Sequence, residues 1–113
     1  MMHALTKPKS SPENIPHLAV TPLVTAVGDP LRWAILAELA DGEPLMVKEI
    51  AQRLGRKPSI VSKHLAVLRA AGAVVQGRGR LYQIPPHFRI APDQRHVDFG
   101  HCLLRLPAAE AQA

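Results

Sequence analysis

Two short amphipathic segments joined by a turn of about three residues constrain this chain more than any other feature. The first, within 43–55, keeps its apolar residues on one stripe and stops at Gly55, a natural helix end. The second begins at Pro58, which suits the first turn of a helix, and runs to Gly72. Two helices joined in this way are the sequence form of a helix-turn-helix. The buried stripe predicted for the second helix is Val61, Leu65 and Leu68.

Small polar and basic side chains crowd the start of that second helix. Ser59, Ser62, Lys63 and His64 fall within its N-terminal half. They form either an ordinary solvated face or a surface that meets another molecule. A helix that reads DNA makes its base contacts from its N-terminal turns, and for His64 we favour DNA contact over packing between helices. Lys57, with the helix N-terminus, is placed to hold a phosphate.

Basic residues are concentrated in one segment of the chain. The formal net charge is +5, yet none of the nine acidic residues falls between Ile50 and Pro92. Such a segment either spreads its charge over a solvated surface or meets an anion, and nucleic acid is the commonest partner of a small basic domain. We therefore expect double-stranded DNA as the partner. The basic residues of this segment are Arg53, Arg56, Lys57, Lys63, Arg69, Arg78, Arg80 and Arg89.

After Gly72 the pattern changes from helical spacing to two strand-like runs, 73–76 and 81–84. The residues between them alternate glycine with Arg78 and Arg80, which is typical of a hairpin tip. Arginines at such a tip have no apolar surface to cover. We expect them to contact the phosphate backbone or the minor groove, with a plain exposed turn as the alternative.

Two further helices are predicted before the pair. Apolar residues recur at helical spacing over 31–40, where Asp29 can cap and Pro30 fits the first position. The segment 17–28 has apolar residues on more than one side, so we expect a short helix that buries much of itself, against this chain or a second copy.

The length of 113 residues and the hydrophobic content of 47% fit one compact domain. We expect flexible tails at 1–16 and 107–113, a DNA-binding domain at 17–84, and a C-terminal loop and strand at 85–106 with a possible role in dimerisation. The first 16 residues contain no apolar run typical of a signal peptide or a membrane span. With a single cysteine, Cys102, an intramolecular disulfide is excluded, and we expect a cytoplasmic protein.

The order of helix, helix-turn-helix and basic hairpin is similar to that of a winged-helix domain. The runs "GDPLRWAILAELADGE", "IAQRLG", "SIVSKHLAVLRAAGAV" and "GRGRLYQI" resemble the ArsR-type family of bacterial transcriptional regulators over roughly 27–84. The resemblance implies a homodimer that binds a palindromic operator and represses transcription until it senses a signal.

The sequence departs from that family at its sensing sites. Many relatives bind metals through a Cys-x-Cys pair on the first helix of the helix-turn-helix, where this chain has Met46 and Lys48. Others bind zinc through a long C-terminal helix, which the prolines of 85–107 disfavour. Arg56 also stands in the turn where the family usually has an apolar residue. We therefore expect no cofactor, and a small-molecule or redox effector stays open.

A C-terminal strand is predicted in place of the usual last helix, because 96–106 alternates. It would extend the wing sheet or pair with its copy across a dimer axis. On a strand His101 and Cys102 point to opposite faces, so we expect no metal site; His87 and His96 do not alter this. Cys102 is then a buried small residue or a redox-responsive thiol. One predicted face carries Val97, Phe99, His101, Leu103 and Arg105, and the other carries Asp98, Gly100, Cys102, Leu104 and Leu106.

The predicted fold is mainly α with a small β-hairpin, an α+β winged helix-turn-helix with an additional C-terminal strand. The predicted function is a sequence-specific DNA-binding regulator, with a winged-helix protein-interaction module that lacks DNA binding as the alternative. We find no placeable catalytic triad, phosphate-binding glycine loop or paired carboxylates, so we do not expect an enzyme.

Overall fold

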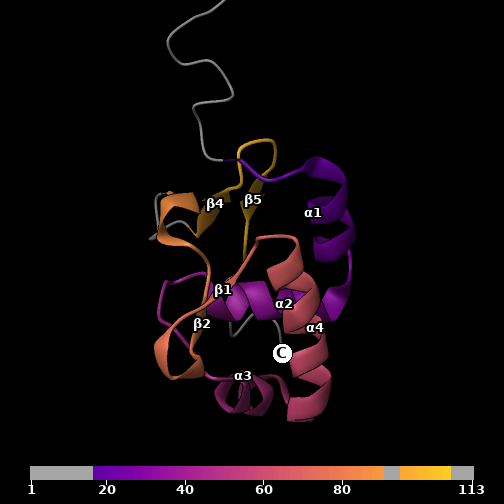
Figure 1. Ribbon diagram of the computed structural model, residues 1–113, viewed down its shortest axis with the longest axis vertical. Coiled ribbons are helices and arrows are strands. Elements are labelled where there is room, and N and C mark those ends of the chain that lie inside the picture. Colours follow the sequence, from indigo (N-terminus) through magenta and orange to yellow (C-terminus); the bar gives the residue numbers. More distant parts are fainter. Residues whose placement is uncertain (1–16, 91–94, 108–113) are drawn as a thin grey trace, which may run out of the picture.

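The computed structural model describes residues 17–90 and 95–107, and the tails predicted at 1–16 and 107–113 lie outside them except for Pro107. Four helices precede two small antiparallel sheets (Figure 1). This is the α+β arrangement of a winged helix-turn-helix that the sequence predicts. The helices are α1 (Val20–Val27), α2 (Pro30–Leu39), α3 (Val47–Leu54) and α4 (Pro58–Ala70). The strands are β1 (Val75–Gln76), β2 (Tyr82–Gln83), β3 (Arg89–Ile90), β4 (His96–Asp98) and β5 (Leu103–Arg105).

Helix α2 begins where the sequence predicts. The Asp29 carboxylate accepts hydrogen bonds from the backbone N–H groups of Leu31 and Arg32, at 2.9 and 3.0 Å. Pro30 occupies the first helical position, where its missing N–H is no loss. This cap fixes the N-terminus of α2 directly after α1.

The predicted turn between α3 and α4 is confirmed. The Met46 backbone N–H donates to the Glu49 carboxylate at 2.8 Å, which fixes the start of α3. Gly55 ends α3 in the left-handed conformation, with φ of 66°. Lys57 is extended and Pro58 opens α4. The two helices therefore leave the turn at an angle set by Gly55 and Pro58.

One core joins the helices to both sheets. The predicted stripe of α4 is fully buried, and the C-terminal segment adds Phe99, whose ring meets that of Phe88 at a centroid distance of 5.1 Å. The C-terminal sheet thus packs into the same core as the helix-turn-helix. Buried members include Leu23, Ile35, Leu36, Leu39, Ile50, Val61, Leu65, Leu68, Tyr82, Ile84, Phe88, Val97, Phe99, Leu104 and Leu106.

The hairpin predicted after Gly72 is confirmed, with shorter strands than expected. Strands β1 and β2 pair antiparallel, with Gln76 opposite Tyr82. Leu45 adds a bridge on the other side, because its backbone exchanges two hydrogen bonds with Tyr82, at 2.9 and 2.7 Å. The hairpin, which we name the wing (75–83), is therefore anchored to the segment that leads into α3.

The single C-terminal strand predicted at 96–106 is wrong. The segment is a hairpin of β4 and β5, and β3 joins it to give the order β3-β4-β5. The chain turns at Gly100, whose φ is +99° and whose N–H donates to the Asp98 carboxylate at 2.9 Å. An Asp and a Gly two residues apart are a turn signal that the alternating pattern concealed.

The faces predicted for that strand are also wrong, because the turn shifts the alternation. Val97 and Phe99 are buried before the turn, and Leu104 and Leu106 are buried after it. Leu103 is 59% exposed although the alternation groups it with Phe99. The sheet pairs within the chain rather than with the wing.

Arg95 ties this sheet to α2. Its guanidinium donates to the carbonyl oxygens of Leu106 and Pro107, at 3.3 and 2.8 Å, and to that of Ala37 in α2. The backbone of Arg95 has φ of 59°, a conformation that non-glycine residues rarely adopt. The end of β5 is thereby held against the last turns of α2 by one side chain.

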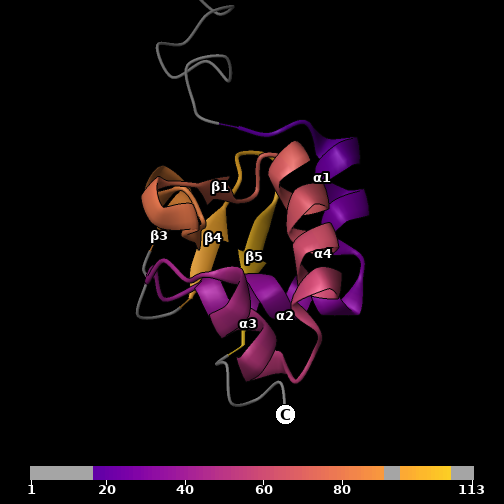
Figure 2. The ribbon, with the colours of Figure 1, turned by 60° about the horizontal axis from the view of Figure 1, so that its bottom comes forward.

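Helix α1 buries one stripe only. Leu23 and Ala26 are inside the core, whereas Val20 is 46% and Val24 52% exposed. Figure 2 shows α1 running beside α4. Within this chain, α1 therefore leaves part of its apolar surface to solvent.

Candidate nucleic-acid interface

The outward face of α4 carries two of the residues that the sequence places at DNA. Ser59 and Lys63 are exposed and lie one turn apart, on the side opposite the buried stripe. Ala66 and Ala70 continue this face and are also exposed. Small side chains around one lysine leave the helix backbone open to close approach by another molecule.

A groove of about 470 Å³ lies between the start of α3, the front of α4 and the wing. It brings Ser62 of α4 and Arg80 of the wing to the same opening. Figure 1 shows the tip of the wing beside α3, at the end of the molecule where α4 begins. The groove is lined by Met46, Val47, Lys48, Pro58, Ser62, Gln76, Arg80 and Tyr82.

The tip of the wing is a tight turn at Arg78–Arg80, with both arginines exposed. Gly79 has φ of 69° and Arg80 has φ of 60°. The left-handed conformation costs a non-glycine residue about 1 kcal/mol. Arg69 of α4 donates to the Gln76 side chain at 2.7 Å and so links the helix to the base of the wing.

The basic segment is only partly neutralised by the protein itself. Arg53 lies 3.6 Å from Glu38, which is buried, and the Arg89 guanidinium packs beside Gly42. Within residues 17–90 and 95–107, no carboxylate pairs with five other exposed cations of this segment. Their charge is available to an anion. These cations are Arg56, Lys57, Lys63, Arg78 and Arg80.

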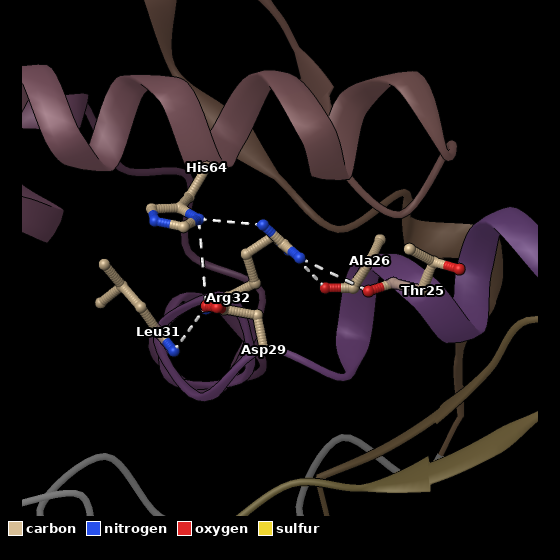
Figure 3. A network of polar contacts seen from close by, with 6 residues as sticks. All are labelled: Thr25, Ala26, Asp29, Leu31, Arg32 and His64. Atoms are coloured by element: carbon tan, nitrogen blue, oxygen red, sulfur yellow. Dashed lines mark hydrogen bonds and ion pairs between the residues drawn. The ribbon is translucent and has the colours of Figure 1, made fainter.

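His64 lies on the flank of α4 that faces α2, rather than on the outward face with Lys63. Its ring atom Nδ1 is 3.1 Å from Arg32 Nη1 and 3.9 Å from Asp29 Oδ2 (Figure 3). The side chain is 25% exposed. One edge of the ring is therefore engaged in packing between helices, while contact of the remaining edge with DNA stays a prediction.

Asp29 is held in its charged form at this junction. The pKa of its carboxyl is lowered, first by the hydrogen bond from the Arg32 backbone N–H and then by the nearby Arg32 guanidinium. The Leu31 N–H and His64 act in the same direction. The α2 cap is consequently ionised well below neutral pH.

Sequence reasoning missed three residues near these surfaces. Lys48 and Gln76 line the groove, and Arg32 contacts His64. The polar face of the first helix marks Lys48, but its position depends on where the wing folds back. Arg32 falls among the apolar residues of α2 with no signal in the local pattern.

The histidines and the cysteine of the C-terminal segment do not gather. The described residues contain no group of three or more His, Cys, Asp or Glu side chains that could hold a metal. The expectation that His101 and Cys102 point to opposite faces of a strand is wrong. Both residues lie in the turn between β4 and β5. His101 meets His17 ring to ring at 4.8 Å, and Cys102 is partly buried.

A family model described as a helix-turn-helix domain matches residues 27–76, the segment that contains α2, α3, α4 and β1. No curated protein and no solved structure matches the chain. The match agrees with the α3–α4 geometry and indicates a DNA-binding regulator. Among the described helices, none is long and apolar enough to cross a membrane.

Proposed function

We propose that this protein is a sequence-specific transcriptional regulator of ArsR-like winged-helix type, a cytoplasmic dimeric repressor that binds a palindromic operator. The observation that carries the proposal is the placement of Ser62 and Arg80 at one groove, beside the outward face of α4. A helix and a basic wing directed at the same anion are what DNA binding by this fold requires.

The residues have two roles: some contact base edges and give sequence specificity, and others bind the DNA backbone. Ser59, Ser62 and Lys63 meet base edges in the major groove, because they stand on the exposed N-terminal turns of α4. Lys57 and the N-terminus of α4 hold a phosphate. Arg78 and Arg80 contact the backbone or the minor groove, contacts that strengthen binding to any sequence.

Exposed apolar side chains at the other end of the molecule support dimerisation. Val20 and Val24 on α1 and Leu103 on β5 are 46%, 52% and 59% exposed. They lie outside the groove that we assign to DNA. A two-fold dimer would present two α4 helices to half-sites about one helical turn apart.

Selection of bound fragments from a random duplex library tests the proposal, with the molecular mass measured in parallel. We expect a palindrome, a mass twice that of the chain, and an affinity that falls steeply with salt. Absence of salt-dependent binding to any duplex would contradict the proposal and favour the protein-interaction module.

A further inference from the structure

Arg32 connects three helices through one guanidinium. Its Nε donates to the carbonyl oxygen of Ala26 at 2.6 Å, and its Nη2 donates to that of Thr25 at 3.4 Å, both in the last turn of α1. Its Nη1 is the atom that meets His64 of α4 (Figure 3). The side chain starts on α2, so α4 is joined to the α1–α2 junction at this point.

The contact determines where the His64 ring carries its proton. A guanidinium has five N–H donors and no acceptor, so at 3.1 Å the Nδ1 atom of His64 must accept. A neutral imidazole that accepts at Nδ1 carries its hydrogen on Nε2. The structure therefore assigns the Nε2–H tautomer to His64 when the ring is neutral.

The Nε2 atom is the free edge of the ring. Figure 3 shows it on the side away from Arg32. Nothing in the described part of the chain bonds to it, and the side chain is 25% exposed. The adjacent surface of α4 includes Ile60, which is 38% exposed, and beyond it the N-terminal turn assigned to phosphate.

We propose that Arg32 is a positioning residue for DNA binding. It fixes the His64 ring so that Nε2–H donates to a phosphodiester oxygen beside α4, and this proposal rests on the proposed function. His64 then acts as an anchor to the DNA backbone, whereas the sequence places it among the base readers. The chemistry requires only a neutral donor and an anionic oxygen acceptor.

The first experiment measures the ring nitrogens of His64 in the full ¹⁵N-labelled protein without DNA. Spectra that correlate ring hydrogens with nitrogens distinguish the two neutral tautomers. We expect pure Nε2–H for the unmodified protein and a mixture for Arg32→Met, which keeps an unbranched apolar side chain but removes the guanidinium and all its donors. The Nδ1–H tautomer in the unmodified protein would overturn the proposal.

The second experiment is a double-mutant cycle on duplex binding. His64→Ala should weaken operator and random DNA alike by about fivefold, the usual value of one hydrogen bond, and Arg32→Met should weaken both by no more than this, because part of the Nε2–H tautomer remains. The two losses should not add, because Arg32 acts through His64. A further loss from Arg32→Met in the His64→Ala background would contradict the positioning role.

Controls distinguish a failure of the Arg32–His64 inference from a failure of the proposed function. If Arg32→Met does not fold, Arg32→Lys keeps the charge but cannot span both the α1 carbonyls and His64, and it replaces Arg32→Met in the cycle. Should the unmodified protein bind no duplex, the proposed function and the phosphate contact fail together, while the tautomer result still stands on its own. If it binds and the single variants lose nothing, only the Arg32–His64 inference is overturned.

Discussion

The helix-turn-helix with its wing and the C-terminal sheet differ in how their sequence patterns repeat. In α3 and α4 the apolar period continues unbroken from the first turn to the last, and a left-handed glycine follows, Gly55 at the cap of α3 and Gly72 just beyond the cap of α4. In the C-terminal segment the alternation continues across Gly100 although the chain reverses there. A repeating pattern locates an element only when its interruptions are identified as well.

The two regions differ in chemistry as well. The end of the molecule with α3, α4 and the wing exposes unneutralised cations around a groove. The C-terminal sheet exposes Leu103 and pairs Arg105 with His96 across β4 and β5 at 3.0 Å. Under the proposed function, the first region binds DNA, and the second has a structural role and contributes to a dimer.

The largest expected effect is on the free energy of unfolding, and it tests whether the C-terminal sheet is part of the core. Phe99→Ala should lower the free energy of unfolding by about 3–5 kcal/mol, because it empties a fully buried ring site beside Phe88. Chemical denaturation of the full chain measures this loss, with one transition expected.

Leu103→Ala in the same hairpin is the matched control. The side chain is largely exposed, so the free energy of unfolding of the monomer should change by less than about 0.5 kcal/mol. An unchanged denaturation midpoint for Phe99→Ala would mean that the sheet is an appendage rather than part of the core.

A smaller effect compares the turn glycines of the two regions. Gly55→Ala and Gly100→Ala should each lower the free energy of unfolding by about 1 kcal/mol, because both backbones are left-handed, with φ of 66° and 99°. At Gly55 an added Cβ meets no atom within 4 Å, so the loss there is conformational. Gly55→Asn should recover part of it. Gly100→Ala without any loss of stability would exclude the tight turn between β4 and β5.

The smallest expected effect is on the stability of the protein at low pH. The pKa of Asp29 is lowered in the folded protein, so its ionised cap stabilises the fold above the ordinary value of 3.8. That contribution is lost as the pH falls through the lowered pKa. Asp29→Asn keeps a capping oxygen without the charge, and its stability should fall less than that of the unmodified protein between about pH 5 and pH 2. If the unmodified protein and Asp29→Asn lose the same stability over this pH range, the charge of Asp29 does not contribute to the stability of the fold.

The helices could be predicted because local rules determine them. Asp29 and Pro30 begin α2, Gly55 ends α3, and Pro58 begins α4, each by chemistry that acts within a few residues. The C-terminal hairpin could not be predicted in this way. Its strands are only two or three residues long, and Arg95 holds them through contacts with Ala37, far away in the sequence.

The sequence could predict which side chains of α4 are exposed, but not where each of them points. Exposure of Ser59, Ser62 and Lys63 follows from the phase of the buried stripe in α4. His64 falls at the border of that stripe, so one edge of its ring can contact α2 while the other stays at the surface. Arg32 contacts the edge that faces α2, and no local sequence pattern could show that contact.

We infer that the front of α4 contacts base edges while the wing binds the DNA backbone. The most direct measurement compares the affinities of Lys63→Ala and Arg78→Ala for the selected operator and for random duplex, over a range of salt. Lys63→Ala should weaken the operator about tenfold more than random DNA. Arg78→Ala should weaken both equally and reduce the salt slope by about one. Equal losses on both DNAs for Lys63→Ala would show that Lys63 of α4 does not contribute to sequence recognition.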